Sequence, residues 1–396
     1  MLSVLQVTPE LNAGGVERTT LEMAEAISRA GGLALIASAG GRLEPDLEAA
    51  GGELIKLPLA SKNPITLISN AFKLARIAKK RGVDVIHARS RAPAWSALMA
   101  ARMRGVPFVT TFHGVYNARS PLKRFYNSVM ARGDVVIANS EYTKEHILRH
   151  YHVASVDRVV AIPRGVDLDV FDRAKVSDVD VAAMRASWNV AERDARCIII
   201  APARLTRWKG QMQLIESVSL IEKRRPGALK VIFAGDAQGR DAYLDEMKTA
   251  IEKAGLQDVV AIAGHIVNMP AAFAASDVAV FPVIEAEAFG RGAIEAQAMG
   301  VPVIASNLGG YTETIVEGDT GFLAPPGAVS ALAAAIERII DAGAPERAAM
   351  GRRGRGRVSR LYSKEALQTA TLAVYQRLLT EAAQPRGKKA QGAPVL

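Results

Sequence analysis

Two acidic residues separated by seven positions form the most chemically suggestive pattern in the sequence. Glu287 falls in a loop after an apolar run, and Glu295 lies about one turn inside the helix predicted to follow. Phe289, Gly290 and Arg291 stand between them, where the backbone entering a helix presents N–H groups. Carboxylates accept hydrogen bonds from hydroxyls, and N–H groups donate to phosphates. The pattern indicates a site for a phosphorylated polyhydroxyl ligand. Two acids on a surface helix are the plainer alternative, but the small apolar residues around them disfavour it.

A short basic loop follows the first apolar run of the second half of the chain. Arg204 and Lys209 flank this loop, which leads into a helix predicted to begin at Gly210. Arginine offers a planar fork of donors, lysine a point charge, and the helix N-terminus a partial positive charge. This combination suits a diphosphate. A solvated basic loop would carry the same charges, but it does not explain the position at the carboxyl end of a strand.

Two features of the first half could also face a ligand. Gly14 and Gly15 stand between a predicted strand and a helix, where glycine lets the backbone approach an anion. A tight turn alone would explain them equally well, and they lack the spaced G-x-G-x-x-G pattern of NAD-binding enzymes. His113 ends an apolar run and precedes a glycine, which points it at the edge of a sheet. A capped loop histidine is an equal alternative.

Other titratable residues favour structural roles. The single cysteine, Cys197, opens an apolar run and is interpreted as a buried thiol. His146, His150 and His152 cluster near one predicted helix without convincing carboxylate partners, which favours a solvated face over a metal site. His87 also ends a predicted strand, but less around it indicates function than around His113.

Strands that alternate with helices must position these residues. The predicted strands are 2–7, 33–37, 83–87, 108–111, 135–138 and 159–162, then 197–201, 230–234, 259–261, 278–282 and 302–305. The predicted helices include 16–30, 70–81, 143–151, 210–225, 242–254, 292–299 and 329–342. This alternation indicates parallel sheets covered on both faces by helices. We therefore predict an α/β protein with two Rossmann-like domains, whose ligands lie beyond the carboxyl ends of the strands, in the cleft between the domains.

The predicted domain boundaries follow the loss of this alternation. Residues 1–168 form an N-terminal Rossmann-like domain, 169–196 a charged linker and 197–362 a C-terminal Rossmann-like domain. We expect 363–383 to form a helix that returns to the N-terminal domain, and 384–396 to form a disordered tail.

Composition bounds the function further. The chain has 396 residues, 49% of them hydrophobic, which supports two sizeable cores. It lacks an apolar stretch of about 18 residues and a charged leader at its start, so we expect a cytoplasmic protein. The net charge of +10 favours phosphates, polyanions or an anionic membrane face.

Two segments mix basic and apolar residues. Residues 65–81 and 121–132 carry lysines and arginines among isoleucine, leucine and phenylalanine, which suits an anionic bilayer surface or a phosphorylated glycolipid. Amphipathic helices with a solvated basic side are at least an equal explanation. Peripheral association with the cytoplasmic face of the inner membrane stays open at this point.

Taken together, the motifs resemble the family 4 retaining glycosyltransferases, which have the two-domain GT-B fold and include lipopolysaccharide-core and glycolipid transferases. The resemblance covers almost the whole chain, and the order and spacing of its motifs are specific although no single motif is. The matching segments are 14–18, 111–114, 138–140, 162–167, 203–210, 234–236 and the two glutamates.

The resemblance implies a role for each candidate residue. Glu287 would hold hydroxyls of the donor sugar, Glu295 the ribose, and His113 would lie beside the transferred sugar. Arg204 and Lys209 would neutralise the donor diphosphate, so that 197–362 would bind the nucleotide-sugar and 1–168 would be the acceptor-side domain. The remaining donor contacts would come from Gly14, Gly15, Ile266 with His265, Phe289, Gly290 and Arg291. The family uses neither a metal nor another cofactor, since the nucleotide-sugar is itself a substrate.

The chain departs from the family pattern at three positions. Ala203 replaces a glycine, Arg164 replaces an asparagine, and Arg291-Gly292 replaces a common Leu-Pro pair. Donor choice therefore cannot be copied from relatives. We expect a UDP-sugar first and GDP-mannose second, with transfer to a saccharide or glycolipid in cell-envelope polysaccharide or lipopolysaccharide synthesis.

Three alternatives are weighed against this reading. A nucleotide-sugar epimerase would share the architecture. A nucleic-acid-binding protein would use the charge and the arginine-rich segment 352–360, but no aromatic residues interleave its arginines, so we expect a solvated loop there and no nucleic-acid partner. Asp167 and Asp169 match a D-x-D metal motif, but their place at the domain edge disfavours a metal role.

Overall fold

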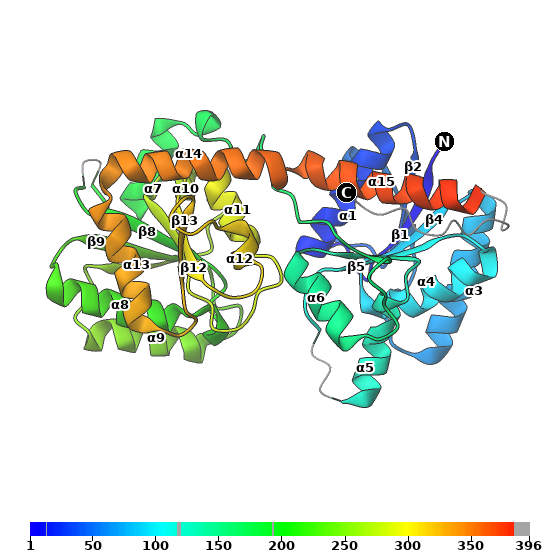
Figure 1. Ribbon diagram of the computed structural model, residues 1–396, viewed down its shortest axis with the longest axis horizontal. Helices are drawn as coiled ribbons and strands as arrows, with labels where there is room; N and C mark the ends of the chain where they lie inside the picture. Colours follow the sequence, from blue (N-terminus) through cyan, green and yellow to red (C-terminus); the bar gives the residue numbers. More distant parts are fainter. Residues whose placement is uncertain (13, 117–119, 192–193, 384–396) are drawn as a thin grey trace. The chain divides into compact units, whose positions relative to one another are not determined.

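The computed structural model describes residues 1–12, 14–116, 120–191 and 194–383, which form two compact units. Unit 1 comprises 1–139, 143–162 and the chain from Leu367 onward, and unit 2 comprises 140–142 and 163–366. Figure 1 shows a sheet flanked by helices in each unit. The tail predicted at 384–396 lies outside the described residues.

Unit 1 is built on a parallel seven-stranded sheet in the order β3-β2-β1-β4-β5-β6-β7. Its strands are β1 (Ser3–Val7), β2 (Leu33–Ser38), β3 (Gly52–Lys56), β4 (Val85–Ala88), β5 (Phe108–Phe112), β6 (Val135–Ala138) and β7 (Val159–Ala161). Strand β1 is buried along its whole length, as expected of a central parallel strand. The edge strand β3 was not predicted, because Glu53 and Lys56 interrupt its apolar residues and leave it half exposed.

Helices cover both faces of this sheet (Figure 1). They are α1 (Gly15–Arg29), α2 (Glu44–Ala49), α3 (Pro64–Lys80), α4 (Arg91–Arg104), α5 (Pro121–Asn127) and α6 (Glu141–His150), with a 3-10 turn η1 (Ser128–Ala131). The Asn63 side chain caps α3 by accepting hydrogen bonds from the Ile65 and Thr66 amides, and Pro64 occupies its first turn. Helix α3 thus begins six residues before the predicted start, and α4 was not predicted as a helix.

Unit 2 contains a parallel six-stranded sheet in the order β10-β9-β8-β11-β12-β13. Its strands are β8 (Cys197–Pro202), β9 (Leu229–Ala234), β10 (Val260–Gly264), β11 (Val278–Phe281), β12 (Val303–Ser306) and β13 (Gly321–Ala324). Alternate residues of β8 pack into two cores, one on each face of the sheet. Ile199 belongs to one core, and Ile198 and Ile200 belong to the other. The short edge strand β13 was not predicted.

One helix of unit 2 lies in the segment 169–196, which the sequence predicted to be a linker. The helices of this unit are α7 (Asp178–Ser187), α8 (Gln211–Arg224), α9 (Asp241–Lys253), α10 (Met269–Ala274), α11 (Arg291–Ala298), α12 (Tyr311–Thr314), α13 (Val329–Asp341) and α14 (Gly343–Leu361), with turns η2 (Arg173–Lys175) and η3 (Arg207–Lys209). Residues 169–196, predicted as a linker, carry α7, and Trp188 is buried in the same core as Phe273 of α10. This segment is part of unit 2.

The arginine-rich segment is helical, so the prediction of a loop was wrong. Helix α14 buries Met350, Gly351, Gly354 and Val358, and a Cβ at Gly351 would lie 1.7 Å from the Gly300 carbonyl oxygen. Glycine therefore lets α14 approach the backbone that follows α11.

Three arginines of α14 form contacts within unit 2. Arg353 pairs with Asp319 at 2.8 Å, Arg355 with Asp172 at 3.0 Å, and Arg357 donates to the Glu313 carbonyl oxygen at 2.9 Å. These contacts give Arg353, Arg355 and Arg357 a structural role within unit 2.

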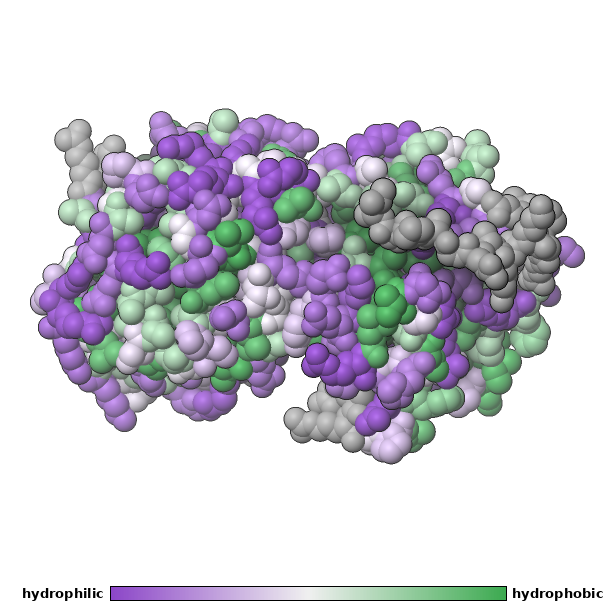
Figure 2. All heavy atoms as spheres, in the orientation of Figure 1, coloured by the Kyte–Doolittle hydropathy of each residue, from purple (hydrophilic) through white to green (hydrophobic). Residues whose placement is uncertain are grey.

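The C-terminal helix α15 (Lys364–Ala383) packs on unit 1 from Leu367 onward. Val374, Tyr375 and Leu378 join the core that contains Met23 and Ile27 of α1. Within the described residues, no helix is both long and apolar enough to cross a bilayer. Figure 2 shows hydrophobic side chains on the visible face singly or in small groups among hydrophilic ones.

Candidate functional site

Three neighbouring strands of unit 2 end at the loops that carry most of the candidate residues of this unit. The sheet order reverses between β8 and β11, which pair directly, and β12 lies on the other side of β11. Their carboxyl ends therefore meet at one edge, the position where open α/β sheets bind ligands. The loop after β8 carries Arg204 and Lys209, the loop after β11 carries Glu287, and the loop after β12 leads into α12.

The loop after β8 is held close to the end of β11. Gly210 adopts the left-handed conformation with φ 76°, and a Cβ there would lie 1.7 Å from the Pro282 carbonyl oxygen. The Ile284 amide donates to the Trp208 carbonyl oxygen at 2.9 Å, and the Lys209 ammonium lies 4.2 Å from the centre of the Trp208 ring. The backbone thus places Lys209 at the start of α8, beside the loop that follows β11.

Lys209 and Glu287 form an ion pair at the centre of the site. The distance from Lys209 Nζ to Glu287 Oε2 is 2.8 Å, and their side chains are only 12% and 27% exposed. The Tyr311 hydroxyl donates to the same oxygen at 2.8 Å. Of the described residues, none donates to the other oxygen of Glu287, Oε1. One carboxylate oxygen is therefore fixed by the protein, and Oε1 can accept from a ligand.

Backbone contacts fix the main chain of Glu287. The Gly310 amide donates to the Glu287 carbonyl oxygen at 2.8 Å, and a Cβ at Gly309 would lie 2.3 Å from that oxygen. Burial and the adjacent Glu287 charge raise the pKa of Tyr311 well above its ordinary value. The phenol therefore stays protonated and keeps donating to Glu287 at physiological pH.

Helix α11 starts against the same tyrosine. Its N-cap, Gly290, has φ 81°, and a Cβ there would lie 2.6 Å from the Tyr311 ring. Arg291, the first residue of α11, forms an ion pair with Glu295 four residues later, with 2.9 Å between Arg291 Nε and Glu295 Oε1. Each predicted acid thus has a cation beside it, Lys209 for Glu287 and Arg291 for Glu295.

The other predicted donor residues of unit 2 are spread along the sheet edge. Arg204 is exposed directly after β8, and within the described part of the chain its guanidinium has no carboxylate partner. Ile266 and His265 follow β10, two strands away from β8, with Ile266 half-buried and His265 exposed. The Phe289 side chain is buried against Val166 and Tyr362, which leaves only its backbone to face a ligand.

The predicted residues of unit 1 lie at the corresponding edge of its own sheet. Gly14 is the N-cap of α1 with φ 130°, a conformation that favours glycine, and Gly15 begins the helix. His113 directly follows β5 and is half-buried.

His87 and Arg89, by contrast, are sealed inside unit 1. His87 Nδ1 lies 2.6 Å from the Tyr375 hydroxyl and Nε2 lies 2.7 Å from Thr111 Oγ1. Arg89 is 2% exposed and donates twice to Gln6 Oε1, at 2.9 and 2.6 Å. Burial, with the charges of Arg89 and His113 nearby, lowers the pKa of His87 well below its ordinary value. His87 is a neutral structural residue.

Tyr311 is the site residue that sequence reasoning missed. A signal was present, because Gly309 and Gly310 follow a strand, as the glycines of the other predicted loops do. Nothing in the sequence, however, shows that this loop reaches Glu287, since that contact depends on β11 and β12 being neighbours.

Several alternative sites have structural explanations. Burial raises the pKa of Cys197 to about 12, which leaves a protonated, unreactive thiol. Asp167 pairs with Lys364 at 2.9 Å and Asp169 with Lys175 at 2.8 Å, so lysines balance both acids of the D-x-D motif. Among the described residues, no group of three or more His, Cys, Asp or Glu side chains is placed to hold a metal ion.

Comparisons with known proteins agree across the chain. Residues 13–170 match the model of Glycosyltransferase Family 4, and residues 185–357 match that of Glycosyl transferases group 1. D-inositol 3-phosphate glycosyltransferase from Paenarthrobacter aurescens is 29% identical over 65% of this chain and 64% of its own length. The chain thus spans slightly less than two thirds of that relative.

Solved structures extend the likeness to the whole chain. HepE from Anabaena, crystallised with UDP and glucose, is 24% identical with a TM-score of 0.77, covering 95% of this chain and 100% of its own. A glycosyltransferase from Rickettsia africae is 35% identical with a TM-score of 0.88, covering 96% of this chain and 98% of its own. This chain belongs to the family 4 glycosyltransferases and has their GT-B fold, with two Rossmann-like units.

Proposed function

We propose that the chain transfers a sugar from a nucleotide-sugar donor to a hydroxyl of a saccharide or glycolipid acceptor, with retention of anomeric configuration and without a metal. The Lys209–Glu287–Tyr311 cluster at the edge of the unit 2 sheet carries this proposal. It combines a fixed ammonium group with a carboxylate whose Oε1 can accept a hydrogen bond from a sugar hydroxyl.

The charges suggest how the reaction proceeds. The bond from the anomeric carbon to the diphosphate breaks, and the acceptor oxygen bonds to the same face of that carbon. The acceptor proton passes to the departing diphosphate. An ammonium has three N–H donors, so Lys209 can keep its bond to Glu287 and still donate to a phosphate. Lys209 and Arg204 would stabilise the charge that develops on the leaving group.

The donor itself is the first point to test. UDP-sugars are the first candidates and GDP-mannose is the second, and HepE, which was crystallised with UDP and glucose, gives limited support because its likeness concerns the fold. A thermal-shift panel of nucleotide-sugars should show one donor that raises Tm, because a ligand of the folded state stabilises it. A panel in which no nucleotide-sugar raises Tm would contradict the proposal.

Incubation without acceptor separates this function from epimerisation. A transferase leaves the selected donor intact or hydrolyses it slowly, whereas conversion of its sugar into a stereoisomer would identify an epimerase. Turnover should persist in EDTA, because Arg204 and Lys209 supply the positive charge. Loss of turnover in EDTA, with recovery on adding Mg²⁺, would refute the metal-independent mechanism.

The cellular role we propose is cell-envelope polysaccharide or lipopolysaccharide synthesis at the cytoplasmic face of the inner membrane. Helix α3 supports a peripheral position, because Ile65 and Phe72 are 79% and 61% exposed and basic residues follow on the same helix. Co-sedimentation with phosphatidylglycerol vesicles at low salt should detect this association, and a protein that stays in the supernatant would contradict it.

A further inference from the structure

A cavity of about 1030 Å³ opens in unit 1 beside the loop that carries His113. Its lining includes Val115 and Tyr116, which follow His113 two and three residues later, together with the starts of α3, α4 and α5. This volume lies at the upper end of the range for small-molecule sites. Its described lining residues all belong to unit 1.

The cavity is positively charged. Lys62, Arg91 and Lys123 line it, and its described lining includes no aspartate or glutamate. Within the described ranges, neither Lys62 nor Lys123 forms an ion pair with a carboxylate. Arg91 donates to Asn127 Oδ1 at 3.0 Å and lies 4.3 Å from the centre of the Tyr116 ring. Its guanidinium is therefore held in place by neutral groups and keeps its full charge for an anion.

Ordered aromatic rings form one wall. Trp95 and Phe125 stack with their ring centres 5.4 Å apart, and Trp95 Nε1 donates to the Tyr126 carbonyl oxygen at 3.1 Å. Phe125 is nonetheless 59% exposed. Flat rings fixed in this way offer a preorganised apolar surface, which suits the face of a sugar ring.

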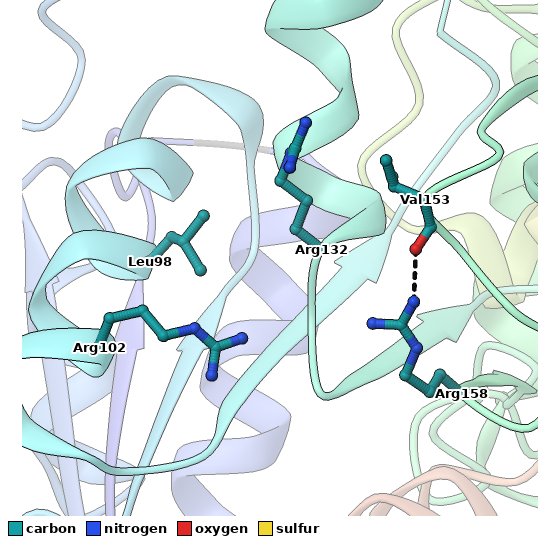
Figure 3. A pocket seen from close by; sticks show the side chains of 5 residues that line it. All are labelled: Leu98, Arg102, Arg132, Val153 and Arg158. Atoms are coloured by element: carbon teal, nitrogen blue, oxygen red, sulfur yellow. Dashed lines mark hydrogen bonds between the residues drawn. The ribbon is translucent and has the colours of Figure 1, made fainter.

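The cationic surface continues along α4. Arg91, Trp95, Leu98 and Arg102 recur at spacings of three and four residues and so share one face of the helix. The last two line a second, smaller cavity of about 280 Å³ with Arg132, Val153 and Arg158, shown in Figure 3. The Arg132 guanidinium joins the two cavities, since it lies 5.7 Å from the centre of the Trp95 ring.

We propose that the larger cavity binds a phosphorylated saccharide, whose sugar lies on Trp95 and Phe125 and whose phosphate is held by Arg91, Lys62 and Lys123. This inference rests on the proposed function, because it makes the phosphorylated saccharide the acceptor. The charges provide the selectivity: a phosphate forms charge-assisted hydrogen bonds with the three cations, while a neutral sugar cannot. Inorganic phosphate would contact the three cations but not the rings of Trp95 and Phe125.

Titration calorimetry on the full chain tests this directly. Maltose 1-phosphate should bind at least about tenfold more tightly than either maltose or inorganic phosphate. The double substitution Lys62→Glu/Lys123→Glu should abolish this preference, and Trp95→Ala should weaken binding about tenfold. Both lysine side chains are exposed, so reversing their charge should not disturb folding. The double variant therefore tests the proposal even if Trp95→Ala is unstable.

Lys248→Glu, at an exposed position of α9, is the matched control and should bind maltose 1-phosphate as the unchanged chain does. Titration with UDP keeps the two proposals apart: the Lys62 and Lys123 variant should bind UDP normally. Equal affinity for maltose and maltose 1-phosphate, or a phosphate preference that survives the double reversal, would overturn the acceptor proposal and leave donor binding untouched.

The phosphorylated saccharide could be free or attached to a lipid, and vesicles distinguish the two. Phosphatidylcholine vesicles that carry a polyprenyl-phosphate-linked glucose should retain the protein if the acceptor is lipid-borne, and the double reversal should release it. Binding only to free maltose 1-phosphate supports a water-soluble acceptor. Equal retention by phosphatidylglycerol vesicles, unaffected by the reversal, would overturn the proposal, because it would show general attraction to an anionic surface.

Discussion

The two sheets end in polar clusters of opposite character. At the edge of unit 2, Lys209 and Glu287 form a partly exposed ion pair, and one carboxylate oxygen accepts from no described residue. In unit 1, His87 and Arg89 lie at the end of β4 and are sealed by Tyr375, Thr111 and Gln6. Both clusters satisfy the rule that buried polar groups are paired. Only the cluster in unit 2 has capacity left for a ligand.

The difference shows that a histidine or arginine at a strand end does not by itself mark a site. Tyr375 comes from α15, nearly 290 residues after His87, so the last helix decides that His87 is structural. In unit 2 the loops beside Glu287 come from neighbouring strands, and among the described residues none donates a hydrogen bond to Oε1. We therefore expect substitutions in unit 2 to affect turnover and those around His87 to affect stability.

The largest effect is expected from Lys209→Ala. In the proposed mechanism Lys209 donates to the leaving diphosphate, so removing the ammonium should lower kcat by about 10² to 10³-fold. Arg204→Ala should lower it by a similar order. Steady-state kinetics with the selected donor measure both, and Lys248→Ala serves as the control. Near-normal turnover in either variant would rule out the diphosphate role of that residue.

His87→Phe should act on stability instead. It leaves the Tyr375 and Thr111 hydroxyls without their buried partner, which should cost about 3 kcal/mol of unfolding free energy. Denaturant unfolding measures this loss. The kcat of the folded fraction should change little, and a fall in kcat without a loss of stability would place His87 in the catalytic machinery.

The same histidine gives a pH test. Its folded pKa lies well below 6.5, so below that pH the unfolded chain binds a proton that the folded chain does not. The free energy of unfolding should therefore fall as pH drops below about 6.5. In the His87→Phe variant it should fall less steeply. His152→Ala, at an exposed position, is the control. Identical pH profiles for the His87 variant and the unchanged chain would show that His87 is not held neutral.

A smaller effect is expected from Tyr311→Phe. The substitution keeps the ring that packs against Gly290 but removes the hydroxyl that orients Glu287. We expect kcat/KM for the donor to fall about tenfold, the typical weight of one hydrogen bond to a charged group. An unchanged kcat/KM would mean that Lys209 alone is enough to orient the carboxylate.

The smallest effect is expected from Arg291→Leu, which introduces the residue common in relatives. It releases Glu295 from an ion pair whose members are about one fifth exposed. Partly exposed pairs of this kind contribute little, so donor affinity should change about two- to fivefold. The donor panel should also show whether preference among sugars shifts. A hundredfold loss would mean that Arg291 itself contacts the donor.

The sequence predicted the central strands well, because buried parallel strands are continuous apolar runs. It missed the edge strands β3 and β13, whose short or charged segments lack that pattern. It also mistook α14 for a loop, because Gly351 and Gly354 look like breakers until α11 is packed against them.

The pairing of the site residues could not be predicted. Arg204, Lys209, Glu287 and Glu295 were identified from their types and spacing, but the contact of Lys209 with Glu287 depends on the order of strands in the sheet. The same applies to Tyr311, and to Tyr375 beside His87. Contacts between distant segments follow from topology, which single motifs do not encode.

Calorimetric titration with a nucleoside diphosphate and its nucleoside tests the central claim most directly. The nucleotide is the one selected by the donor panel, and Lys209→Ala is compared with the unchanged chain. If Lys209 holds the diphosphate, the unchanged chain should prefer the diphosphate strongly, and the variant should lose most of that preference while binding the nucleoside equally well. A variant that keeps the full preference would show that the diphosphate binds elsewhere.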